Sequence, residues 1–204
     1  MFGKVAADVL GLSDIGAVIK PADFNKVDSD DYVMHEDGEK IYFLIKSKTD
    51  EYCFTNQALI HLDGKSAMSK KRMLKRIPYG IHGVSEVFLE TAGTVDLDIE
   101  IKFDMGGVKY SIDVRKVHLP ELKDLYKSLL KIAEIQHENK VSRLHGEASL
   151  EVAVNTLSNV YKTEANLVEQ FKAVNQYAFD WKRQMRAQFH VHDFGPVFEK
   201  YINN

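Results

Sequence analysis

The spacing of apolar residues along this chain changes near residue 118. Residues 40–116 alternate apolar and polar side chains with a period of two, which is typical of half-buried strands. Residues 119–189 repeat apolar side chains every three or four positions, which is typical of amphipathic helices. The pattern predicts a β-rich module followed by more helix than one small domain needs. That surplus must bury its apolar stripe against something, and a second copy of the chain is a good candidate.

Turn residues divide the first part of the chain into short strands. Thr49-Asp50 and Asp63-Gly64 are typical turn signals, and the acidic stretch 20–39 favours a solvated loop. The expected strands are, in chain order, residues 32–35, 39–47, 51–62, 81–90, 95–102 and 108–114.

The clearest hairpin joins the last two of these strands. Residues 104–107 (DMGG) can make its turn, because glycine tolerates a positive φ. A simple register across that turn predicts that Asp96 faces Arg115 and that Asp98 faces Asp113. The second pairing would be repulsive unless a cation came from elsewhere.

Helical signals dominate the ends of the chain. Residues 2–12 predict a short helix, and Pro120 suits the first turn of another. We expect Gly146 to end or kink that helix and a long helix to start near Glu147. The apolar stripe of the helix that begins near Pro120 consists of Leu119, Leu122, Leu125, Leu129 and Ile132.

Composition narrows the class of protein. The 204 residues carry a net charge of −3, which gives no general attraction to nucleic acid, so no nucleic-acid partner is expected. The single cysteine, Cys53, excludes an intrachain disulfide and fits a reducing compartment. The N-terminal residues do not resemble a signal peptide, so we expect a cytoplasmic protein.

Several short segments together resemble the bacterial pleckstrin-homology (PH) domain family. They are Phe54-Thr55-Asn56 with Leu59-Ile60, Ile77-Pro78-Tyr79, and Glu90-Thr91-Ala92-Gly93 followed by Asp96, Asp98 and Glu100. The later helices resemble the YvbH-type oligomerisation extension that follows such domains. The resemblance implies an α+β fold: a PH-like β-barrel or sandwich of two antiparallel sheets, capped by a C-terminal helix. It also implies an α-helical hairpin extension and assembly into ring-like oligomers, with a PH-like domain at 1–133 and the extension at 134–204.

The resemblance gives no enzyme activity or cofactor to carry over. It implies a non-enzymatic, self-assembling scaffold or interaction protein whose main partner is a second copy of itself. Binding of phosphoinositides does not follow from the fold, because the first expected turn, residues 48–51, is acidic on balance.

A basic run is the first candidate site. Its members are Lys65, Lys70, Lys71, Arg72, Lys75 and Arg76. The run could bind an anionic membrane, a phosphate ligand or an acidic protein. It could equally be a solvated loop and edge strand in which lysines discourage unwanted pairing. A peripheral binder of anionic lipid or phosphate through residues 65–76 is therefore the alternative function.

Two further groups of residues are candidates for contacts between copies. The outward face of the acidic strand offers carboxylates for ion pairs, for plain solvation, or for metal or acid–base chemistry. The helical stripe can pack onto the first domain or against another subunit. The residues are Asp96, Asp98 and Glu100 on the strand, and Leu150, Leu157, Tyr161 and Phe171 on the stripe.

Metal and nucleophile signals are weak. His190, His192 and Asp193 form a local cluster, but a structural zinc site needs about four ligands, so we expect no metal. Cys53 stands between two aromatic residues in an expected strand and is expected to be a buried thiol.

Overall fold

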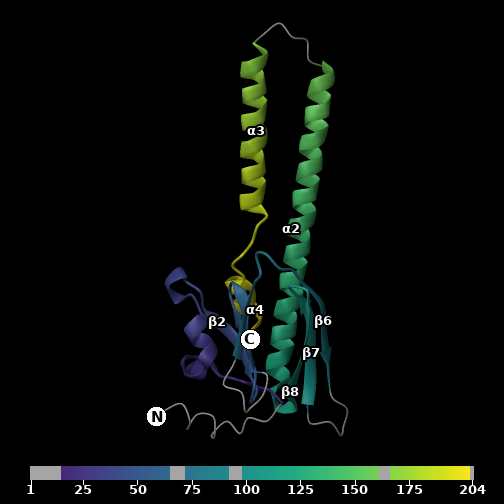
Figure 1. Ribbon diagram of the computed structural model, residues 1–204. Helices are drawn as coiled ribbons and strands as arrows, with labels where there is room; N and C mark the ends of the chain where they lie inside the picture. The colour runs from purple at the N-terminus through teal and green to yellow at the C-terminus, as the bar shows by residue number, and fades with distance from the viewer. Residues whose placement is uncertain (1–14, 65–71, 92–97, 161–165, 203–204) are drawn as a thin grey trace. The chain divides into compact units, whose positions relative to one another are not determined.

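The computed structural model describes residues 15–64, 72–91, 98–160 and 166–202 (Figure 1). The chain forms two compact units. The first contains Met1–Glu134 and His192–Asn204, and the second contains Ile135–Val191. The last residues of the chain, which the sequence analysis assigned to the extension, thus lie in the first unit.

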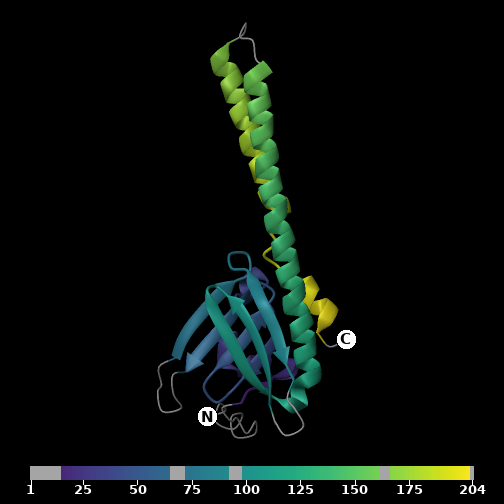
Figure 2. The same ribbon diagram turned by 90° about the vertical axis from the view of Figure 1, so that its right-hand side faces the viewer.

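The first unit contains two antiparallel sheets, as expected for an α+β fold (Figure 2). The five-stranded sheet has the order β1-β2-β3-β4-β5, and the three-stranded sheet has the order β6-β7-β8. The strands are β1 (Ala17–Val18), β2 (Ile41–Lys46), β3 (Glu51–Thr55), β4 (Ala58–Gly64), β5 (Arg72–Pro78), β6 (Val84–Glu90), β7 (Asp98–Met105) and β8 (Val108–Arg115).

Alternation of side chains sets which face of each sheet is buried. In β7 every second side chain, from Ile99 to Met105, is buried, and the intervening polar ones point outward. The strands β3 and β4 are buried on both faces, and their buried residues include the polar Glu51, Thr55 and His61 beside apolar ones. Phe54 and Phe103 lie at the centre of this core, with their rings 6.0 Å apart.

Two expectations about strands were wrong. Residues 32–35 are not a strand, because 3-10 helices η1 (Pro21–Lys26), η2 (Asp28–Tyr32) and η3 (His35–Asp37) occupy the acidic stretch. Residues 51–62 are two strands rather than one. The break lies after Thr55, whose hydroxyl accepts hydrogen bonds from the backbone N–H groups of Gln57 and Ala58 and so closes a tight turn.

The register of the last hairpin also differs from the expected one. Its turn lies at Gly106 and Gly107, which have φ values of 62° and 77°. Asp98 therefore faces Arg115, and Glu100 faces Asp113. The turn lies one residue later than predicted, and this moves every cross-strand pair by two residues.

Helices complete the first unit. After the 3-10 turn η4 (Lys116–His118), helix α2 (Leu119–Val160) begins, and its first four turns pack on the sheets. Four of the five residues of the predicted stripe are confirmed as core residues, because they are fully buried: Leu122, Leu125, Leu129 and Ile132.

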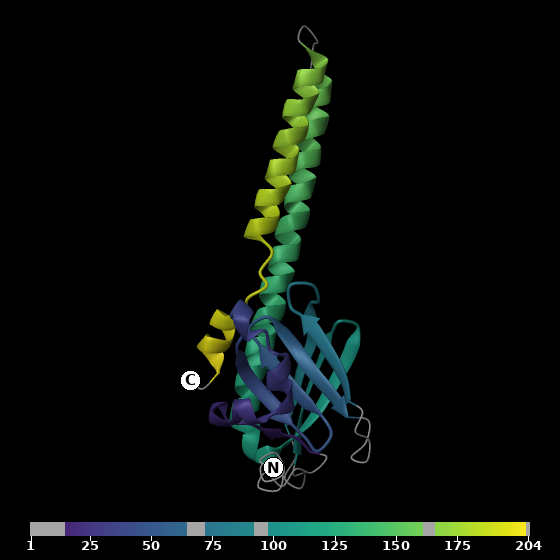
Figure 3. The ribbon, with the colours of Figure 1, turned by 60° about the vertical axis from the view of Figure 1, so that its left-hand side comes forward.

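The chain returns to the first unit at its end. Helix α4 (Gly195–Tyr201) lies beside β2 (Figure 3). Phe194 and Phe198 are buried there, and the Phe198 ring stacks on Tyr42 at 5.4 Å. The Asn56 carbonyl accepts from the Phe194 N–H at 2.7 Å, and the Asn56 amide donates to Asp193 at 3.0 Å. These contacts fix the chain terminus to the turn between β3 and β4.

Candidate functional site

The second unit is a helical hairpin. The part of α2 from residue 135 onward and α3 (Leu167–Gln188) run side by side in opposite directions (Figures 2 and 3). The prediction that Gly146 ends or kinks α2 was wrong, because the helix continues through this residue. A Cβ at Gly146 would lie 2.6 Å from Met185 Cε and 2.8 Å from Trp181 Cη2. The glycine thus permits close packing of α3, which offsets its cost of about 1 kcal/mol in helix propensity.

Large apolar side chains remain exposed along this hairpin. Phe171 is 71% exposed, Tyr177 68% and Val152 66%. Both helices contribute: the full set is Leu144, Val152, Val154 and Leu157 on α2, and Val168, Phe171, Val174, Tyr177 and Phe179 on α3. Large apolar side chains exposed in this number on one hairpin indicate an interaction surface, because their contact with water is unfavourable. We call this set the exposed apolar face.

The predicted helical interface residues are only partly on this face. Leu157 and Phe171 are exposed members of it, and Leu150 is half-buried in the hairpin. The prediction that these residues form the stripe of one helix was wrong, since Phe171 belongs to α3 and the other two residues belong to α2. Tyr161 lies outside the described residues.

The basic run is largely neutralised where the structure describes it. β5, which carries the second half of the run, is the edge strand of its sheet. Arg72 pairs with Asp28 and lies 3.8 Å from Glu51, and Lys75 pairs with Asp63 at 3.0 Å. Arg76 pairs with Glu39 at 3.0 Å. These cations stabilise the fold and offer little uncompensated charge to an anion; Lys65, Lys70 and Lys71 lie outside the described residues.

Two buried glutamates organise the 3-10 segment around that strand. Glu39 accepts from the Met34 N–H at 2.7 Å, from the Thr55 hydroxyl and from Arg76. Glu51 accepts from the Ser29 N–H at 2.8 Å and pairs with Lys46. Buried charges are tolerated when they are paired and hydrogen-bonded in this way.

The acidic strand face is a mixed-charge surface. Lys102 lies 2.9 Å from both Glu90 and Glu100, and Ser111 also donates to Glu100. Hydrogen bonds from Ser111 and Lys102 hold the pKa of Glu100 below its usual value. Partial desolvation raises the pKa of the Asp113 carboxyl, although the residue is exposed, and the nearby Glu100 and Asp98 carboxylates raise it further. Asp96 lies outside the described residues.

The histidine-rich segment and the cysteine do not form a metal or nucleophile site within the described residues. Among the described residues, three or more His, Cys, Asp or Glu side chains nowhere converge as a metal site would require. Asp193 instead accepts from the Gly195 N–H at 2.8 Å. Cys53 is fully buried, as expected, and burial raises the pKa of its thiol far above the usual range. Within the described part of the chain, the helices are too short or too polar to cross a membrane.

The two sheets and the capping helix define a PH-type domain, and comparison with known proteins agrees. Residues 9–133 match the family model of the bacterial PH domain, and residues 145–204 match that of the YvbH-like oligomerisation region. The chain therefore belongs to the bacterial PH-domain family.

Relatives support the same assignment. The uncharacterized protein YvbH of Bacillus subtilis is 57% identical over 204 residues, which are 100% of both chains. The uncharacterized protein YjqA of the same organism is 36% identical over 73 residues, 36% of this chain and 57% of YjqA. A crystal structure of a PH-domain-containing protein from Exiguobacterium sibiricum is 53% identical and has a TM-score of 0.86. The match covers 93% of this chain and 100% of that one.

Sequence reasoning missed three features of the site. The packing role of Gly146 and the docking of Phe194 and Phe198 depend on residues distant in sequence. A cluster of cations on the hairpin, around Arg143 and Arg186, was also missed. The signal for that cluster was present, since both arginines lie on expected helices, but their convergence needs the hairpin geometry.

Proposed function

We propose that this protein is a non-enzymatic, self-assembling PH-like scaffold that forms ring-like homo-oligomers in the cytoplasm. The observation that carries the proposal is the exposed apolar face of the hairpin. Two antiparallel helices bury one narrow seam between them, and this face lies outside that seam. A second hairpin would remove it from water, and aromatic residues such as Phe171 and Tyr177 suit the centre of such a contact.

Two other findings support a scaffold. The match of residues 145–204 to an oligomerisation region falls on the segment that holds the exposed apolar face. The cations of β5, on which the anion-binding alternative depends, are engaged by carboxylates of the same chain. Binding of lipid or phosphate through the basic run is therefore not favoured. Asp98 and Glu100 remain candidates for ion pairs between copies of the first unit, since charge complementarity fixes the register of a contact.

The experiment is native mass spectrometry of the full chain and of two matched variants. Leu157→Asp places a charge on the exposed apolar face, whereas Thr156→Asp places the same charge on the neighbouring exposed residue of α2. We expect wild type and Thr156→Asp to give one defined oligomer, and Leu157→Asp to give smaller species with unchanged β-sheet circular dichroism. A charge buried in a contact between copies costs several kcal/mol, which should weaken that contact.

Negative-stain electron microscopy of the wild-type oligomer tests the ring. Closed particles of uniform size are expected, because repeated heterologous contacts close into rings when their rotation permits. A monomer at high micromolar concentration would refute self-assembly. Open filaments would refute the ring, and an unchanged mass for Leu157→Asp would refute the role of the hairpin.

A further inference from the structure

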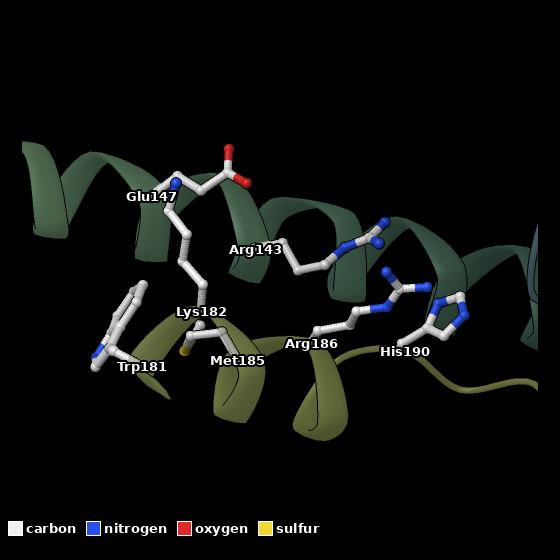
Figure 4. Close-up of a pocket in the computed structure, with 7 residues that line it drawn as sticks. All are labelled: Arg143, Glu147, Trp181, Lys182, Met185, Arg186 and His190. Carbon is white, nitrogen blue, oxygen red and sulfur yellow. The ribbon is translucent and has the colours of Figure 1, made fainter. Parts of the chain in front are cut away.

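The hairpin contains a cleft of about 350 Å³ between α2 and α3 (Figure 4). Volumes of this size are typical of small-ligand sites. The cleft lies within the second unit, and both helices line it. The lining residues are Arg143 and Glu147 on α2, Trp181, Lys182, Met185 and Arg186 on α3, and His190 just after α3.

Positive charge predominates in this cleft. Arg143, Lys182 and Arg186 form no ion pair with any residue that the structure describes. Figure 4 shows the side chains of Arg143 and Arg186 extending in the same direction, toward the end of the cleft that His190 lines, with the Glu147 carboxylate turned away from them. Like charges brought together repel unless a counter-ion separates them. The arrangement is thus suited to an anion that lies between the two guanidinium groups.

The other end of the cleft is apolar. Trp181 and Met185 are half-buried there, because Gly146 on the facing helix leaves room for both side chains. An indole ring beside a cationic cluster presents a flat apolar surface to a ligand whose charged end lies on the arginines. The cleft therefore has two guanidinium groups at one end and the apolar Trp181 and Met185 at the other, where the Lys182 side chain extends toward α2 near Glu147 (Figure 4).

We propose that this cleft binds a phosphate monoester that carries an apolar group. The phosphoryl oxygens accept hydrogen bonds from Arg143 and Arg186, whose planar forks match phosphate geometry. The apolar group lies on Trp181 and Met185. A simple carboxylate matches the site less well, since it carries one negative charge against the two guanidinium groups. The site is separate from the basic run and does not depend on self-assembly.

Trp181 provides a direct probe, since it is the single tryptophan of the chain. The full-length protein is titrated with n-butyl phosphate, inorganic phosphate and n-butanol at constant ionic strength, and tryptophan emission is recorded. We expect a saturable change with butyl phosphate, a weaker affinity for inorganic phosphate and no response to butanol. Sedimentation with phosphatidylcholine vesicles, with and without phosphatidic acid, shows whether the phosphate monoester of a lipid headgroup is also bound.

Three variants test the assignment. Arg143→Gln and Arg186→Gln should each weaken binding of butyl phosphate at least tenfold, which corresponds to about 1.4 kcal/mol of lost charge-assisted bonding. Arg183→Gln removes an exposed arginine of the same helix that does not line the cleft, and it should bind as wild type does. Helical circular dichroism checks that each variant is folded.

The proposal is overturned if neither butyl phosphate nor phosphatidic acid vesicles bind. It is also overturned if Arg143→Gln and Arg186→Gln bind butyl phosphate as strongly as wild type does. The same holds if the control Arg183→Gln loses as much affinity as the two cleft variants. A change of oligomer mass in the two cleft variants without phosphate binding would show instead that the cleft is a contact between copies. Failure here leaves the native mass of the wild type unchanged, so it is distinguishable from failure of the proposed function.

Discussion

Truncation of one buried ring in the last helix should release that helix from the domain. Phe198 is 0% exposed, stacks on Tyr42 at 5.4 Å and lies 6.3 Å from the Tyr79 ring. Replacement of a buried phenylalanine by alanine costs about 3–5 kcal/mol, because apolar contacts are lost and a cavity remains. We therefore expect Phe198→Ala to weaken the docking of α4 by about that amount.

The loss has an upper limit set by the geometry of α4. The helix has seven residues and contributes no strand to either sheet, so it can detach while the sheets stay folded. Two buried rings contribute about 1.5–3 kcal/mol each to its docking. The hydrogen bonds of Asn56 with Asp193 and of Tyr42 with Glu199 add about 1 kcal/mol each. These terms come to about 5–8 kcal/mol before the entropy cost of ordering the helix is subtracted, so a loss of about 3–5 kcal/mol removes most of the docking free energy, and local detachment is the expected outcome.

Hydrogen exchange of the Phe194 amide measures this directly, because that N–H donates to the Asn56 carbonyl across the docking contact. In Phe198→Ala it should exchange about two to three orders of magnitude faster, at 1.4 kcal/mol per tenfold. Amides of β7 should keep their protection. Lys200→Ala changes an exposed residue of the same helix and should stay within about 0.5 kcal/mol of wild type. Unchanged protection of Phe194 in Phe198→Ala would refute the docking argument.

Two further substitutions test the first unit. Glu39→Gln removes the buried charge that pairs with Arg76. Urea unfolding should then show a free energy of unfolding lower by about 3 kcal/mol. An unchanged urea midpoint would mean that the pair contributes no net stability. Asp113→Asn should raise the stability at neutral pH, since partial desolvation and neighbouring carboxylates hold the pKa of Asp113 above its unfolded value and its charged form disfavours folding. The wild type gains stability as the pH falls through that raised pKa, so the advantage of the variant should vanish in acid. A loss of stability at neutral pH, together with a smaller oligomer, would instead place Asp113 in a contact between copies.

Local patterns in the sequence predicted the elements whose burial depends on near neighbours. The alternation from Ile99 onward and the stripe from Leu122 to Ile132 each describe one buried face, and both were confirmed. The expected register was wrong because a turn centred just before Gly106 and one centred just after it give pairings that differ by two residues. A shift of two residues leaves every side chain on the same face of the sheet. The alternation therefore contains no information that separates the two turns.

The candidate site was less predictable because it depends on contacts between distant segments. Arg76 lies 37 residues from its partner Glu39, so the basic run could not be recognised as internally neutralised. The role of Gly146 depends on Trp181 in the facing helix. The exposed part of the hairpin was anticipated from its apolar stripe, but the assignment of Leu157 and Phe171 to separate helices required the structure.

The docking of α4 makes the hairpin an insertion within a discontinuous domain. The bond from Asn56 to Asp193 joins residues 137 positions apart, and α4 follows the hairpin in the chain. The first unit therefore completes its core only after the hairpin has been synthesised. A folded hairpin shortens the effective loop that α4 must close, and a frayed one lengthens it. Any partner that orders the hairpin would thereby favour closure of the domain. Where that partner is a second copy of the chain, as proposed above, the lifetime of the docked α4 should increase with protein concentration.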